Sequence, residues 1–101
     1  MIKKINIILL SLFTSLLAIA NNADYKYITI AENLSHPWGI AVIDKDNILF
    51  TELSGQLRII ENGVLNPEPI KGIPEVLFAG QGGLSGIILD PEFNSNKTIY
   101  L

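Results

Sequence analysis

Residues 80–86, GQGGLSG, contain the residue types and spacing that most suggest chemistry in this sequence. Four glycines surround one glutamine and one serine, directly before the apolar run 87–89. A dinucleotide-binding loop needs glycines in the order G-x-G-x-x-G, entered from a strand and leading into a helix. Counted from Gly80, the third required glycine is Ser85, and the apolar run leads to Pro91 rather than into a helix. The segment therefore does not match a phosphate-binding loop.

Two uses remain for this loop. Its glycines suit a bend that leads into an inner strand, because glycine reaches backbone conformations that other residues avoid. A bend does not explain Gln81, whose side chain offers both a carbonyl acceptor and an amide donor. Held at the start of a strand that faces a central cavity, Gln81 could hydrogen-bond to a polar ligand. From the residues alone, a structural role and a binding role both stay open.

The other chemically capable side chains give weaker signals. His36 is the only histidine and the chain has no cysteine, which excludes thiolate metal sites and disfavours zinc. We expect His36 to be a surface or capping residue rather than a catalyst, and Trp38 to pack in the core or at an inner rim. Asp44, Asp46 and Asn47 resemble the start of a calcium loop, but the glycine and distal glutamate of an EF-hand are missing, so a solvated turn is predicted.

Residues 1–20 have the pattern of a secretory signal peptide. Two lysines precede the apolar stretch 5–17, and residues 18–20, AIA, form a small-x-small cleavage site. The apolar stretch is shorter than the roughly 20 residues of a bilayer span, which favours cleavage over anchoring. We therefore expect residues 21–101 to be periplasmic or secreted, with no membrane attachment after removal of the signal.

The remaining residues are acidic. Without the two signal-peptide lysines, five basic and ten acidic residues are left, a formal net charge of −5. Nucleic-acid binding depends on lysine and arginine to neutralise phosphates, so nucleic acid is not an expected partner. A chain of 101 residues suits at most one small domain.

Short apolar runs separated by turn signals predict an antiparallel all-β fold. Strands are predicted at residues 25–34, 38–43, 48–53 and 57–60, with turns at 44–47, 54–56 and the Asn-Gly pair 62–63. The proline-rich residues 66–79 are predicted as a connection with one short edge strand at 76–78. No helix is predicted after the signal segment.

The strand pattern repeats along the chain. Residues 83–89 resemble residues 37–43, and each run is followed by an aspartate, Asp90 and Asp44, which lie 46 positions apart. That spacing is typical of β-propeller blades. The sequence also stops at Leu101 inside an apolar run, which would leave an unpaired hydrophobic edge. We therefore expect residues 21–101 to be the N-terminal part of a longer propeller domain, with its first blade and the start of its second.

Several short motifs occur in a fixed order along residues 28–101. They are Pro37-Trp38-Gly39, Thr51-Glu52, Gly55, Gly72-x-Pro74, Gln81-Gly82-Gly83-Leu84 and Pro91-x-Phe93. In this order they resemble the glucose/sorbosone dehydrogenase family, the soluble PQQ-dependent aldose sugar dehydrogenases. The family's TERPG hairpin is TELSG here and its HPDF turn is DPEF, and Ser85-Gly86 stand where the family often has LD. Because the first two departures fall in turns, they leave the expected fold unchanged.

The resemblance implies a six-bladed β-propeller that binds PQQ over its central channel, with calcium as the companion ion. It places Gln81 at the PQQ and substrate site. It places the general-base histidine and most other PQQ and calcium ligands beyond Leu101. His36 does not correspond to that histidine. Residues 27–34 would be an outer strand that closes the ring with the last blade.

The implied reaction is oxidation of the C1 hydroxyl of an aldose to the lactone, with electrons leaving to an external acceptor. Because a fold does not fix a function, a non-enzymatic secreted propeller that binds a sugar or a protein partner is the alternative.

We predict that residues 21–101 expressed alone show no cooperative thermal transition. One blade and part of the next cannot close a ring, and repeat units seldom bury their apolar faces alone. Circular dichroism against temperature measures this. A sharp, reversible unfolding transition would contradict the expectation that these residues belong to a larger domain.

Overall fold

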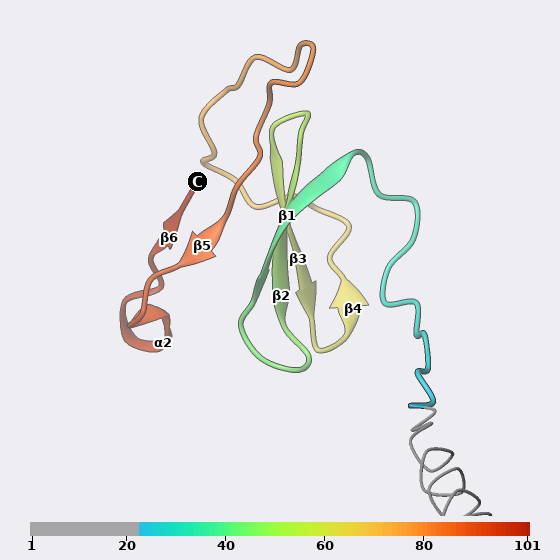
Figure 1. Ribbon diagram of the computed structural model, residues 1–101. Helices are drawn as coiled ribbons and strands as arrows, with labels where there is room; N and C mark the ends of the chain where they lie inside the picture. Colours follow the sequence, from blue (N-terminus) through green and yellow to red (C-terminus); the bar gives the residue numbers. More distant parts are fainter. Residues whose placement is uncertain (1–22) are drawn as a thin grey trace, which may run out of the picture.

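A computed structural model describes residues 23–101, so the predicted signal peptide lies outside the described residues. The elements are β1 (Pro37–Val42), β2 (Ile48–Glu52), β3 (Gln56–Glu61), β4 (Val64–Leu65), β5 (Ile88–Leu89), α2 (Phe93–Asn96) and β6 (Ile99–Tyr100). The first four strands form one antiparallel sheet in sequence order, and β5 pairs with β6 in a second sheet beside it (Figure 1). Within residues 23–101, no helix has the length and apolar character needed to cross a bilayer.

Local side-chain chemistry builds the turns of the first sheet. Between β1 and β2, one Asp44 carboxylate oxygen accepts the backbone N–H groups of Asp46 and Asn47, each at 2.9 Å. The hydrogen bond from the Asn47 side-chain amide is the largest cause that lowers the pKa of Asp44, and the two backbone bonds lower it further. Between β3 and β4, Asn62 and Gly63 have φ of 51° and 76°, the conformation of a tight hairpin turn. Both predicted turns are confirmed.

The turn of the β5–β6 hairpin repeats the first one. Asp90 accepts the backbone N–H of Glu92 at 2.8 Å, the same two-residue step as from Asp44 to Asp46. Asp90 also accepts the Asn96 amide at 2.9 Å and the Tyr100 hydroxyl at 2.7 Å. The backbone bond from Glu92 is the largest cause that lowers the pKa of Asp90, and the Tyr100 and Asn96 bonds lower it further. The same bond to Asp90 raises the pKa of the Tyr100 hydroxyl. The repeat seen in the sequence is therefore also a repeat of local structure.

Some predicted elements are not present. Residues 25–34 and 76–78 form no strand, because no described strand runs beside either segment to provide a ladder. One helical turn, α2, occurs where no helix was predicted; it ends at Lys97 with φ of 52°. It forms inside the longer turn of the second hairpin. The described residues form one four-stranded sheet and one hairpin, so closure into six blades stays a prediction.

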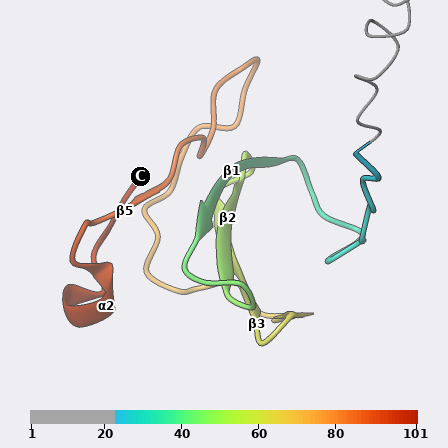
Figure 2. The same cartoon turned by 60° about the horizontal axis from the view of Figure 1, so that its bottom comes forward.

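Chain segments lie against both faces of the four-stranded sheet, and one of the two faces is covered only in part. Along β2, alternation sends Ile48 and Phe50 to one face, where Ile60 completes a core cluster with Ala31, Leu34 and Leu65 packed against it. On the other face Leu57 is 1% exposed, and its carbonyl accepts the N–H of Ile70 at 2.8 Å. Figure 2 shows the segment before β1 on one side of the sheet and the connection after β4 on the other.

A buried ion pair joins these layers. Glu52, at the end of β2, is 1% exposed and accepts the backbone N–H of Ser35 at 2.9 Å. Both of its carboxylate oxygens lie 3.4 Å from Nη1 of Arg58 on β3. The Nη2 of Arg58 in turn donates to the Asn66 carbonyl at 3.2 Å. Glu52 therefore links the segment before β1, strand β3 and the start of the long connection.

We predict that Glu52→Ala lowers the free energy of unfolding of the full-length protein by about 3–5 kcal/mol, because it leaves the Arg58 charge buried without its partner. Denaturant titration measures the change. The matched control is Glu61→Ala, at the exposed end of β3, which should stay within about 0.5 kcal/mol of the wild type. Equal losses for the two variants would show that the ion pair does not stabilise the sheet.

Candidate functional site

Gln81 lies at the tip of a tight glycine turn. The N–H of Gly82 donates to the Ala79 carbonyl at 2.9 Å, and Gly80 has φ of 59° at the first central position. This is the arrangement of a type II′ turn, which favours glycine at that position. Gln81 is the second central residue and is exposed. The turn therefore presents the Gln81 amide to solvent from a defined backbone.

The loop is attached to the sheet directly after this turn. The N–H of Leu84 donates to the Leu53 carbonyl at 3.1 Å, and Leu84 is 6% exposed. At Gly83, with φ of 155°, a Cβ would overlap the Leu53 carbonyl oxygen, so only glycine lets the two backbones approach this closely. The segment around residue 80 consequently projects at the same end of the sheet as the β2–β3 turn (Figure 1).

A second attachment runs through Thr51, which is fully buried. Its hydroxyl donates to the Ser85 carbonyl at 2.6 Å and accepts the N–H of Gly39 at 2.9 Å. A Cβ on Gly39 would lie 2.5 Å from that Ser85 oxygen. One side chain thus joins β1, β2 and the loop. No site role was predicted for Thr51 or Glu52, although a polar pair inside the predicted strand 48–53, ILFTEL, was the available signal.

The other chemically capable side chains named from the sequence include His36 and Trp38. His36 is exposed, as expected; its ring centroid lies 5.3 Å from that of Phe78, and its Nδ1 lies 3.3 Å from the Ser35 hydroxyl. Trp38 is 67% exposed, so core packing is wrong for this residue within the described chain, while the contact at an inner rim stays a prediction. Ile40, which pairs with Phe50 in regular register, is 66% exposed as well, so the described residues leave this part of β1 uncovered.

No metal-binding constellation occurs within residues 23–101: no group of three or more histidine, aspartate or glutamate side chains is placed to hold an ion. As predicted, Asp44, Asp46 and Asn47 form a hydrogen-bonded turn at the surface. Gln81 is therefore the candidate site residue that the described chain presents on a built loop.

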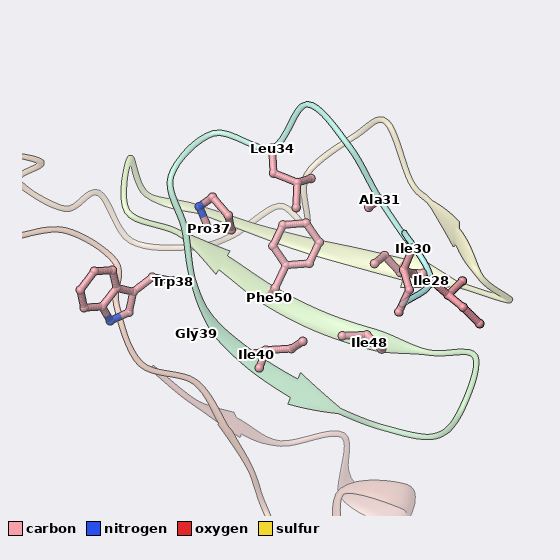
Figure 3. Close-up of a pocket in the computed structure, with 11 residues that line it drawn as sticks. Ile28, Ile30, Ala31, Leu34, Pro37, Trp38, Gly39, Ile40, Ile48 and Phe50 are labelled. Atoms are coloured by element: carbon pink, nitrogen blue, oxygen red, sulfur yellow. The ribbon is translucent and has the colours of Figure 1, made fainter. Parts of the chain in front are cut away.

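An apolar groove of about 340 Å³ lies on the opposite side of the sheet from the loop. Figure 3 shows Ile48 and Phe50 of β2 directed toward Ile28, Ile30 and Leu34 of the segment before β1. Its lining offers carbon rather than hydrogen-bonding groups, so it does not suit a polar ligand. The groove and the Gln81 loop are separate features.

Comparison with known proteins gives a consistent result. A sequence model of the family described as Glucose / Sorbosone dehydrogenase matches residues 34–101. The uncharacterized protein slr1608 of Synechocystis sp. is 43% identical over 89 residues, which are 80% of this chain and 22% of that protein. The aldose sugar dehydrogenase YliI of Escherichia coli is 36% identical over 73 residues, 71% of this chain and 20% of that protein.

Solved structures agree with the sequence matches. A structure described as glucose dehydrogenase has a TM-score of 0.64 and 36% identity, covering 71% of this chain and 21% of its own. The apo-form of the soluble aldose sugar dehydrogenase from Escherichia coli has a TM-score of 0.59 and 38% identity, covering 65% of this chain and 19% of its own. The chain therefore spans about a fifth of the length of the relatives it matches.

We predict that Gly83→Ala in the full-length protein lowers its free energy of unfolding by more than about 1 kcal/mol, because the added Cβ needs a strained backbone and overlaps the Leu53 carbonyl. Gly86→Ala is the matched control, since a Cβ there meets nothing within 4 Å. Thermal unfolding of the two variants measures the difference. Comparable melting temperatures would contradict the close approach of the loop to the Leu53 carbonyl.

Proposed function

The chain belongs to the glucose/sorbosone dehydrogenase family, as its ordered motifs predicted, and we propose that the complete protein oxidises the C1 hydroxyl of an aldose to the lactone with PQQ as cofactor. The relatives named aldose sugar dehydrogenase and glucose dehydrogenase support the substrate class. The proposed site within this chain rests on one observation: the Gln81 amide is exposed on a glycine turn that is held by backbone hydrogen bonds.

The residues present fit a PQQ-binding role for this loop. A Cβ at Gly80 would meet nothing within 4 Å, so the side of the turn is open to a flat polar group. The Gln81 amide can donate to a carboxylate or quinone oxygen, and its carbonyl can accept from a sugar hydroxyl. We propose Gln81 as a cofactor-binding residue that also orients the sugar.

The chemistry is divided between the cofactor and the protein. When bound, PQQ supplies a quinone that accepts two electrons, with calcium as the companion ion beside it. The sugar loses two electrons and two protons, and an external acceptor takes the electrons in the following step. We propose that the general base is a histidine beyond Leu101, as the family resemblance implies. His36 does not match that residue, and its ring centroid lies 5.3 Å from that of Phe78.

The setting of this reaction follows from the first residues of the sequence. The signal-peptide pattern at residues 1–20 supports export, so we propose a periplasmic or secreted enzyme whose substrate reaches it outside the inner membrane. In this proposal the sheet β1–β4 is the first of six propeller blades, and the β5–β6 hairpin begins the second.

We predict that the full-length protein, supplied with PQQ and calcium, reduces an artificial dye when an aldose is present. Gln81→Ala should lower kcat/KM or PQQ affinity on the order of tenfold, because a hydrogen bond to the bound groups is lost. The melting temperature of the apo-protein should stay unchanged, since Gln81 is exposed. Gln56→Ala, an exposed glutamine of β3, is the matched control and should keep wild-type kinetics.

Two results would overturn this proposal in different ways. If no aldose supports dye reduction, the protein is not a sugar dehydrogenase, and a binding role for the same scaffold is left. If the wild type is active and Gln81→Ala has the same kinetics, Gln81 is only a turn residue.

A further inference from the structure

We propose that Thr51 is a positioning residue whose buried hydroxyl sets the place of the Gln81 loop over the first sheet. This inference rests on the proposed function of Gln81. It assigns the threonine a role in cofactor and substrate binding although its side chain is buried and cannot touch either ligand.

Both hydrogen bonds of the Thr51 side chain are with main-chain atoms of two other segments. Its hydroxyl donates to the Ser85 carbonyl at 2.6 Å and accepts from the Gly39 N–H at 2.9 Å. The side chain is 0% exposed, so water does not compete for these bonds. A buried polar group that loses its partner is costly, and the two bonds therefore favour a single arrangement of the three segments.

Few residues separate Gln81 from Ser85, the residue that Thr51 binds, and backbone contacts hold them in place. Ser85 follows Leu84, whose N–H is bonded to the Leu53 carbonyl at 3.1 Å. Gly83 lies against that same carbonyl, and the bond between Gly82 and Ala79 closes the turn that carries Gln81. Each residue from 82 to 85 is thus held by a backbone contact or hydrogen bond. A displacement of Ser85 would therefore also displace the Gln81 amide.

Thr51 is the one side chain that holds this loop by hydrogen bonds within the described chain. Without it, the hydrogen bond between Leu84 and Leu53 is the one within the described chain that still joins residues 83–86 to the residue that follows β2. Productive binding depends on placement to within a fraction of an ångström, and small misplacement by a distant change can lower rates strongly. Removal of the hydroxyl should accordingly weaken ligand binding even where the fold survives.

The test compares Thr51→Val, which keeps the shape and removes the hydroxyl, with the wild type in the full-length protein. We expect the PQQ dissociation constant to rise, or kcat/KM to fall, on the order of tenfold. Amide hydrogen exchange at Leu84 should speed up, confined to the loop. Thr51→Ser keeps the hydroxyl and should keep the wild-type dissociation constant.

Two further variants keep the test decisive. Ile60→Ala opens a cavity in the core cluster on the other face of the sheet, so it destabilises the fold without touching the loop and should leave the PQQ dissociation constant unchanged. If Thr51→Val does not fold, Thr51→Ala replaces it, because the space it leaves lets water satisfy the Gly39 and Ser85 groups without fixing them.

Each outcome decides one question. If the Thr51 variants match Ile60→Ala in PQQ dissociation constant and kcat/KM, or if exchange at Leu84 does not change, Thr51 is structural and the inference is wrong. If the wild type itself neither binds PQQ nor oxidises an aldose, the proposed function fails, and the exchange measurement still shows whether Thr51 holds the loop.

Discussion

Two adjacent polar side chains at the end of β2 hold the described part of the protein together. Thr51 and Glu52 follow one another along a strand, so their side chains point to opposite faces of the sheet. Thr51 bonds the loop that follows the long connection, and Glu52 bonds the segment before β1. Both are almost fully buried, so neither can exchange its partners for water. One dipeptide thereby sets the position of both layers relative to the central strand.

Two glycines make the contacts between the loop and the sheet possible, because the absence of a side chain leaves room for a neighbouring backbone carbonyl. Gly39 lets the Ser85 carbonyl approach β1, and Gly83 lets the loop lie on the Leu53 carbonyl. The hydrogen bonds of Thr51 and Leu84 then fall at good distances. Residues 83–85 of the glycine-rich stretch therefore lie close against β1, β2 and Leu53, and the turn that carries the exposed Gln81 amide extends from them. This explains how a loop without regular structure can present a side chain in a defined place.

The sheet also keeps an apolar face that the described residues cover only in part. Ile40 and Val42 of β1 remain exposed beside the groove of Figure 3. A repeat unit shares its apolar faces with neighbouring units, and the relatives are several times longer than this chain. The matching hydrogen bonds at Asp44 and Asp90 show that the β5–β6 hairpin repeats the turn between β1 and β2. The segment before β1 lies over this face without forming a strand.

The sequence by itself determined the local features. The turns at Asp44 and Asn62, strands β1 to β3, the repeat and the family all depend on residues close together in the chain or on their order. The two-residue strand β4 was not predicted. Tertiary structure decided what depends on distant partners: the burial of Thr51 and Glu52, the exposure of Trp38, and the absence of strands at residues 25–34 and 76–78. Gln81 could be named from its motif, but its support could not, because Thr51 meets Ser85 only once the sheet and the long connection have folded onto each other.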